Sequence, residues 1–247
     1  MNFLIKSVLS VFLCCTTLGM QMSAQVNIIT DGKAASRIVI DTNNPADRQA
    51  AELLQDFINR ISGVTLPVET SGKLQKGDVV IGKGDISGLT EDGFRLQTDN
   101  GILYISSGGD KGSIYGVVTL LENYLGVSYY GSNEYTLKPQ STIILPEINR
   151  AENPAFRYRQ RQNYAMGEDP VYKHWFRLEE PREVFAGGLW VHTFDRILPS
   201  DVYGKAHPEY YSFINGERRP GNASQWCLTN PEVFEIVSQK IDSIFKA

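Results

Sequence analysis

The residues best suited to ligand chemistry gather in the second half of the chain. All the histidines and all the tryptophans fall in a stretch with many glycines and few regular periods, namely His174, His192, His207, Trp175, Trp190 and Trp226. Irregular, aromatic-rich loops are where binding residues concentrate. This stretch therefore holds the candidate site, in which the rings would offer flat apolar faces and the histidines would offer hydrogen bonds.

Two motifs resemble cofactor sites but lack the required pattern. His207-Pro208-Glu209 is not H-E-x-x-H, and proline breaks the helix that this metal motif needs. Gly108, Gly109 and Gly112 make a glycine-rich turn, but no Gly-Lys-Ser/Thr follows at the spacing of a phosphate loop. We therefore expect neither a metal nor a cofactor.

The first 24 residues have the pattern of a secretory signal. Lys6 supplies the positive charge, residues 8–18 are apolar, and Met22-Ser23-Ala24 is a small-residue cleavage site. The apolar run is too short to span a bilayer. We expect export to the periplasm, the cell surface or the medium, and no membrane attachment after cleavage.

Cysteine usage supports simple cleavage of that signal. Cys14 and Cys15 lie inside it, and Leu13 stands before Cys14, where lipid attachment would want a small residue. Cys227 then remains alone, which excludes a disulfide within the chain. A lone cysteine could be a nucleophile but is more often a small apolar residue.

Composition narrows the class of protein and partner. The 247 residues are 42% hydrophobic, which is typical of a globular protein of one large or two ordinary domains. The net charge of −4 is spread out with no basic stripe, so nucleic acid is a poor partner.

The first part of the chain alternates strands and helices. Residues 37–41 form a β-branched strand, and Asn44-Pro45 starts a helix that Gly63 ends. Its apolar positions follow a helical period: Ala50, Leu53, Leu54, Phe57, Ile58 and Ile61. Strands at 66–69, 79–81, 94–98 and 103–106 come next, the last two joined by the hairpin signal Asp99-Asn100-Gly101.

A second helix follows the glycine turn, and together these elements define a fold. Its apolar residues run from Val117 to Leu125, Gly126 stops it, and Tyr129 begins a strand. The order predicts one mixed sheet with helices on a single face, an α+β sandwich over residues 25–150. Prolines punctuate the exit, so we place the boundary at 149–154.

The second part, residues 155–247, has a different character. A strand is expected at 156–164, followed by the aromatic loops. Asn230-Pro231-Glu232 then caps a final helix. Its expected buried stripe is Val233, Phe234, Val237, Ile241, Ile244 and Phe245.

Two resemblances cover nearly all of the chain after residue 24. Tyr115-Gly116 and Leu120-Leu121-Glu122 after a strand and a glycine turn resemble the non-catalytic N-terminal α/β domain of glycoside hydrolase families 20 and 67. Residues 187–233 resemble the bacterial domain of unknown function 4838. The matching elements of that stretch include His192, His207-Pro208-Glu209-Tyr210-Tyr211 and Cys227-Leu228-Thr229-Asn230-Pro231-Glu232.

The resemblance implies that a glycosidase-like (β/α)₈ barrel follows the first domain. Such a barrel takes about 250 residues, so we expect residues 155–247 to be only its start, with residues 189–191 as a second barrel strand. Catalytic carboxylates of families 20 and 67 come from later strands. We therefore expect the catalytic pair beyond residue 247 and leave the catalytic residues of this chain unknown.

Several residues remain as candidates within the chain. Asp195, Asp201, Glu209 and Glu217 are carboxylates without a marked acid–base context. By the resemblance, Arg159 would hold sugar hydroxyls; a structural ion pair is the alternative. His192 would face the site from the end of its strand. The expected substrate-binding residues are Arg159, Trp190, His192, His207, Glu209, Tyr210 and Trp226, with Tyr211 nearby.

Three functions stay open. The first is the N-terminal part of a secreted glycoside hydrolase-like protein that acts on O-glycosyl bonds of a polysaccharide or glycan and is inactive alone. The second is a carbohydrate-binding module without hydrolytic activity. The third is a non-functional fragment whose barrel segment is poorly ordered, because two β/α units cannot close a barrel and would leave apolar strand edges exposed. The first two predict carbohydrate as the partner.

Overall fold

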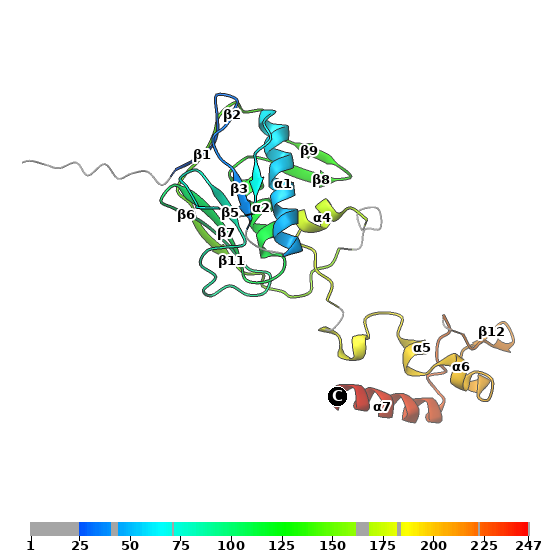
Figure 1. The fold of residues 1–247 in the computed structure, drawn as a ribbon. Coiled ribbons are helices and arrows are strands. Elements are labelled where there is room, and N and C mark those ends of the chain that lie inside the picture. The colour runs from blue at the N-terminus through cyan, green and yellow to red at the C-terminus, as the bar shows by residue number, and fades with distance from the viewer. Residues whose placement is uncertain are drawn as a thin grey trace, which may run out of the picture. The chain divides into compact units, whose positions relative to one another are not determined.

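The computed structural model describes residues 25–40, 44–70, 72–161, 168–181, 184–221 and 223–246 (Figure 1). They form two compact units that divide between Pro154 and Ala155. The expected signal at residues 1–24, with Cys14 and Cys15, lies outside the described residues. Every helix among the described residues is too short or too polar to span a bilayer.

A six-stranded mixed sheet forms the centre of the first unit. Its strands, in spatial order, are β11 (Asn149–Glu152), β6 (Phe94–Asp99), β7 (Ile102–Ser107), β5 (Val79–Ile81), β3 (Ile38–Ile40) and β4 (Val68–Glu69). The pairs β3–β4, β3–β5 and β5–β7 are parallel, and β6 is antiparallel to β7 and β11. Both parallel and antiparallel pairs are therefore present, and the predicted α+β class is confirmed.

Two helices cover one face of this sheet, as predicted (Figure 1). Helices α1 (Pro45–Ser62) and α2 (Gly112–Asn123) contact each other, α1 contacts β3 and β5, and α2 contacts β6 and β7. At the start of α1, the Asn44 side chain accepts a 2.9 Å hydrogen bond from the Ala46 amide. At its end, Gly63 adopts the left-handed conformation, φ 73°, which favours glycine.

The predicted hairpin at residues 99–101 is also confirmed. Asn100 and Gly101 have φ values of 51° and 77°, the two positive angles that a tight hairpin turn needs. Strands β6 and β7 then pair in regular register from Asp99↔Ile102 to Phe94↔Ser107.

The expectation of a single sheet is wrong. A separate sheet has the order β10 (Ile143–Leu145), β1 (Val26–Thr30), β2 (Lys33–Ala34), and β8 (Ser128–Gly131) pairs with β9 (Glu134–Thr136). Strand β1 lies near the start of the unit's sequence and pairs with β10, which lies near its end. A pairing between such distant segments leaves no local pattern for sequence reasoning to find. Strand β11 also carries the six-stranded sheet past residue 150.

Among its described residues, the second unit contains short helices, one small hairpin and one long helix. These are α4 (Pro170–Trp175), η2 (Ala186–Gly188), α5 (Phe194–Ile197), α6 (Ser200–Tyr203), η3 (Pro208–Tyr210), β12 (Phe213–Ile214), β13 (Glu217–Arg218) and α7 (Pro231–Lys246). A small core unites Leu198, Tyr210, Tyr211 and Val233, with Tyr203 and Trp226 packed against it.

Neither strand expected in this unit is present among the described residues. Over residues 156–161 only an isolated bridge occurs, between Arg159 and Glu179, and residues 189–191 form no strand. The rest of the first expected strand, including Tyr164, lies outside the described residues. A barrel strand is held by parallel neighbours, and no parallel pair occurs among the described residues of this unit. The barrel start remains a prediction.

Helix α7 begins as predicted, but its expected burial is wrong. The Asn230 side chain accepts a hydrogen bond from the Glu232 amide at 2.9 Å, which is an N-cap. Only Val233 is buried along the helix, and the side chains of Phe234 and Phe245 are 70% and 76% exposed. An apolar period can specify a helix, whereas burial also requires a covering element.

Candidate functional site

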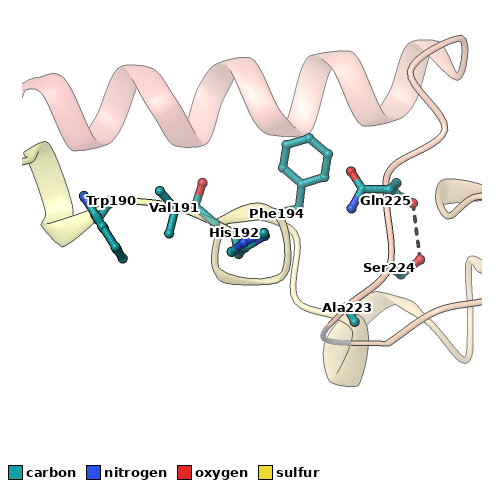
Figure 2. A pocket seen from close by; sticks show the side chains of 8 residues that line it. Trp190, Val191, His192, Phe194, Ala223, Ser224 and Gln225 are labelled. Carbon is teal, nitrogen blue, oxygen red and sulfur yellow. Dashed lines mark hydrogen bonds between the residues drawn. The ribbon is translucent and has the colours of Figure 1, made fainter. Parts of the chain in front are cut away.

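A cavity of about 790 Å³ opens in the second unit between two stretches of chain (Figure 2). Residues 190–194 form one wall and residues 223–225 form the other. The first wall includes α5's opening residue Phe194, and the second precedes Trp226. The volume is within the range of sites that hold small ligands.

Phe194 and Trp226 join the two walls. Their rings stack with centroids 4.0 Å apart and planes at 13°. The Trp226 Nε1 also donates a 3.2 Å hydrogen bond to the Phe194 carbonyl. An aromatic stack and a hydrogen bond thus act between the same two residues, which sets the spacing of the cavity walls.

The second wall is held by hydrogen bonds to nearby residues of the same unit. The backbone amide and the hydroxyl of Ser212 both donate to the Gln225 carbonyl at 2.9 Å. One residue further on, Trp226 forms a bridge with Tyr211, whose hydroxyl donates to the Leu198 carbonyl at 3.2 Å. The Gln225 backbone is therefore fixed while its exposed side chain stays at the cavity.

His192 lines the cavity, although it does so from a bend rather than from the end of a strand. Its backbone has φ 51°, a left-handed conformation that histidine adopts more readily than most residues. Trp190, two residues earlier, is half-buried and also lines the cavity. Two of the predicted binding residues are therefore together at one cavity, with Trp226 behind it.

The described lining combines aromatic rings with hydrogen-bonding side chains. Trp190 and Phe194 supply ring surface, while His192, Thr193, Ser224 and Gln225 supply hydrogen-bonding groups. No carboxylate occurs among the described residues of the lining. The arrangement can bind a ligand that has both polar groups and an apolar face. Its described residues include no pair of carboxylates of the kind that glycoside hydrolysis uses.

Three further predicted residues, His207, Glu209 and Tyr210, form a second group apart from the described cavity lining. The His207 and Tyr210 rings stack with centroids 4.6 Å apart and planes at 9°, and His207 Nδ1 lies 3.1 Å from Glu209 Oε1. The backbone amide of Glu209 and the His207 ring together lower the pKa of the Glu209 carboxyl. The group is held by its own internal contacts.

Tyr210 links this group to α7. Its hydroxyl donates a 2.5 Å hydrogen bond to Glu232 Oε2. The hydrogen bond to this carboxylate raises the pKa of Tyr210 to about 12, with help from burial. Since the neutral phenol is the donor, the contact favours the protonated tyrosine.

Among the residues that the structure describes, His207, Glu209 and Glu232 form a group that could ligate a metal. Their ligand atoms lie within 4.8 Å of one another, and imidazole with carboxylates is a donor set that zinc accepts. Hydrogen bonds already account for the closeness, because His207 contacts Glu209 and Tyr210 donates to Glu232. The geometry therefore fits a polar surface network without an ion.

Arg159 is not among the residues that line the cavity. Its guanidinium donates to the carbonyl oxygens of Arg177 at 2.6 Å and Phe156 at 2.7 Å. Its backbone pairs with Glu179 in both directions. These contacts give the side chain a structural task in its own loop.

The candidate carboxylates are likewise absent from the described lining. Asp195 Oδ1 accepts a 2.8 Å hydrogen bond from the Ser200 amide, which ties α5 to α6. Asp201 and Glu217 are exposed, the latter on β13. None of these is paired across the cavity with another acid.

Sequence reasoning did not single out Thr193, Phe194, Ser224 or Gln225. Serine, threonine and glutamine are common in surface loops, so residue type gave no signal. Phe194 could have been noticed as an aromatic residue two positions after His192, but its stacking on Trp226 spans 32 residues.

Two family models match the chain. Residues 28–124 match glycosyl hydrolase family 20, domain 2, and residues 129–247 match a domain of unknown function (DUF4838). No curated protein matches the chain.

Solved structures with similar parts include three glycosidases. One is a family 20 exo-β-N-acetylglucosaminidase from Vibrio harveyi, with 22% identity and a TM-score of 0.37, covering 54% of this chain and 18% of that one. Another is a β-hexosaminidase from Streptomyces plicatus in complex with N-acetylglucosamine, with 17% identity and a TM-score of 0.40, covering 56% of this chain and 25% of that one. The third is a family 115 4-O-methyl-α-glucuronidase, with 15% identity and a TM-score of 0.39, covering 54% of this chain and 19% of that one. The chain spans a quarter or less of these structures.

The two family matches lie side by side along the sequence, one in each half of the chain, and agree with both predicted resemblances. Through the first match the protein is related to glycoside hydrolases. Residues 28–124 are similar to domain 2 of glycosyl hydrolase family 20, and residues 129–247 are similar to the DUF4838 family.

Proposed function

We propose that this chain is the carbohydrate-recognising N-terminal part of an exported glycoside hydrolase-like protein, and that the cavity between residues 190–194 and 223–225 binds a sugar unit of a polysaccharide or glycan. The observation that carries the proposal is the lining itself, in which Trp190 and Phe194 stand beside neutral hydrogen-bonding side chains. A pyranose ring has an apolar face and a rim of hydroxyl groups, so it needs both kinds of partner.

The family matches support the same class of ligand. Residues 28–124 match domain 2 of glycosyl hydrolase family 20, which favours a carbohydrate ligand. In this proposal residues 155–247 begin a (β/α)₈ barrel, the catalytic carboxylates lie outside the chain, and residues 1–24 direct export.

A carbohydrate-binding module without hydrolytic activity is the second candidate. It is favoured by the lack of any carboxylate among the described lining residues, since hydrolysis needs two. The two candidates share the binding step and differ only in whether cleavage follows when the chain is part of a longer protein.

The test is a titration of the full chain with uncharged and acidic oligosaccharides, followed by tryptophan fluorescence and calorimetry. All three tryptophans, Trp175, Trp190 and Trp226, belong to the second unit, so the fluorescence reports on the unit that holds the cavity. We expect saturable binding without release of shortened glycan. A flat response across the panel would refute the proposal.

Matched variants locate the binding. Trp190→Ala removes ring surface from the cavity and should weaken binding in calorimetry about fivefold, since stacked aromatic contacts are worth on the order of 1 kcal/mol. Phe213→Ala removes an aromatic side chain that is 63% exposed on the β12–β13 hairpin and should leave the affinity unchanged. Equal losses in both variants would place the binding elsewhere.

A further inference from the structure

The described lining of the cavity has no carboxylate, ammonium or guanidinium group, which bears on the class of sugar that it binds. Among the described residues that line it, none is lysine, arginine, aspartate or glutamate. The polar groups are those of His192, Thr193, Ser224 and Gln225, which donate and accept hydrogen bonds without a fixed charge. A hydroxyl group can be satisfied by such partners, whereas a carboxylate in a cavity calls for a cation.

The arginine nearest to the lining residues in the sequence already donates its hydrogen bonds to backbone carbonyl oxygens. Arg196 follows the lining residue Phe194 by two positions, but its guanidinium donates to the carbonyl oxygens of Gly188 at 2.6 Å and Gly187 at 3.0 Å. It lines a different hollow, together with Tyr203 and Lys240. A bidentate arginine clamp is the usual protein partner of a carboxylate, and this guanidinium is aimed at backbone instead.

The residue between Phe194 and Arg196 adds the opposite charge. Asp195 is half-buried and accepts the Ser200 amide. Asp195 directly follows the lining residue Phe194 in the sequence, and a carboxylate at this position supplies no cation for a carboxylate on the ligand. The local charge pattern therefore opposes an acidic sugar at this cavity.

We infer that the cavity between residues 190–194 and 223–225 selects an uncharged pyranose unit and rejects a uronate. This inference rests on the proposed function, because it names the sugar class for the same site. It distinguishes neutral from acidic sugars, and it rests on the described side chains of this chain alone.

The experiment is calorimetry of the full chain at pH 8, where an ordinary histidine is neutral. The uncharged probes are cellotetraose, chitotetraose and xylotetraose. The acidic probes are tetragalacturonate and the C6-oxidised form of cellotetraose, which differs from its partner only at C6. We expect the tightest binder to be uncharged, and we expect oxidation at C6 to weaken binding at least about tenfold because no cation replaces the lost hydration.

A variant with an added positive charge gives a second test of the preference for uncharged over acidic sugars. Gln225→Arg places a guanidinium on the wall at an exposed position and should raise the affinity for tetragalacturonate relative to cellotetraose. Gln239→Arg adds the same charge at an exposed position of α7 outside the described lining and should change that ratio little. If an acidic probe is the tightest binder of the unmodified chain, the inference is overturned while sugar binding stands. If calorimetry detects no binding of any probe, the proposed function itself is wrong.

Discussion

The stacking of Phe194 on Trp226, with ring centroids 4.0 Å apart, is the contact that gives the cavity its two walls. The same two residues share the 3.2 Å hydrogen bond from Trp226 Nε1 to the Phe194 carbonyl. Trp226 also packs against the small core around Tyr211 and Leu198. The cavity therefore depends on the folding of the second unit, and the next prediction tests that dependence.

Trp226→Phe should retain ring surface and lose the hydrogen bond, at a cost of about 1 kcal/mol. Trp226→Ala should lose both and cost about 2–4 kcal/mol. Denaturant unfolding followed by the fluorescence of Trp175 and Trp190 measures both changes in the second unit. If Trp226→Ala unfolds at the same denaturant concentration as the unmodified chain, the stack does not hold the walls together.

The Tyr210–Glu232 contact predicts a dependence of stability on alkaline pH. The pKa of Tyr210 is raised to about 12 in the folded chain by the Glu232 carboxylate, above the ordinary value of about 10. The stabilisation is thus complete below about pH 10 and is lost as the pH rises towards about 12. Absorbance titration near 295 nm, with Tyr210→Phe subtracted to isolate one phenol among many, measures this pKa.

Glu232→Gln provides the matched control for that titration. The amide keeps an oxygen acceptor but removes the negative charge, so the pKa of Tyr210 should return towards its ordinary value. An unchanged titration in this variant would mean that the carboxylate is not the cause of the shift.

The start of α1 gives a test in the first unit. Asn44→Ala removes the side-chain acceptor of the Ala46 amide and should lower the free energy of unfolding by about 1 kcal/mol. Asn44→Asp keeps an acceptor and should be nearly neutral. Thermal unfolding followed by far-ultraviolet circular dichroism makes the comparison, and equal effects of the two substitutions would count against the cap.

Close packing between α2 and the sheet gives a second test there. A Cβ atom at Gly116 would lie 2.6 Å from Ile105 Cγ2, so Gly116→Ala should destabilise the first unit by about 1–3 kcal/mol through overpacking. Gly221→Ala meets no atom within 4 Å and serves as the control. A stable Gly116→Ala variant would show that the helix can move away from the sheet.

Cys227 should be more reactive than an ordinary cysteine. The hydrogen bond with Thr229, and next the Arg218 side chain, lower the pKa of its thiol. Because the thiolate is the nucleophile, the rate of alkylation by iodoacetamide should rise at a lower pH than in a model thiol. Thr229→Val should move the profile to higher pH; an unmoved profile would argue against the hydroxyl as a cause.

Local patterns explain which parts of the fold could be predicted. The α1 helix was readable because Asn44, Pro45 and Gly63 mark its ends and its apolar residues keep a helical period. The hairpin was readable because Asn100 and Gly101 suit positive φ angles. These signals lie within a few residues of the structure that they specify.

Distant contacts explain what could not be predicted. Strand β1 pairs with β10, although almost all of the first unit's sequence lies between them. The exposure of Phe234 on α7 depends on which elements cover the helix. Trp190 and His192 could be chosen by residue type, but Ser224 and Gln225 reach the cavity only because Trp226 stacks on Phe194. Residue type alone carries no trace of that contact.

The most direct test of the account is a nuclear magnetic resonance titration of the isotope-labelled chain with chitotetraose and cellotetraose. The account predicts that the backbone amide signals of residues 190–194 and 223–225, together with the indole N–H of Trp226, shift on binding while those of the first unit stay in place. Shifts confined to other residues, such as 207–210, or no shifts at all, would contradict it.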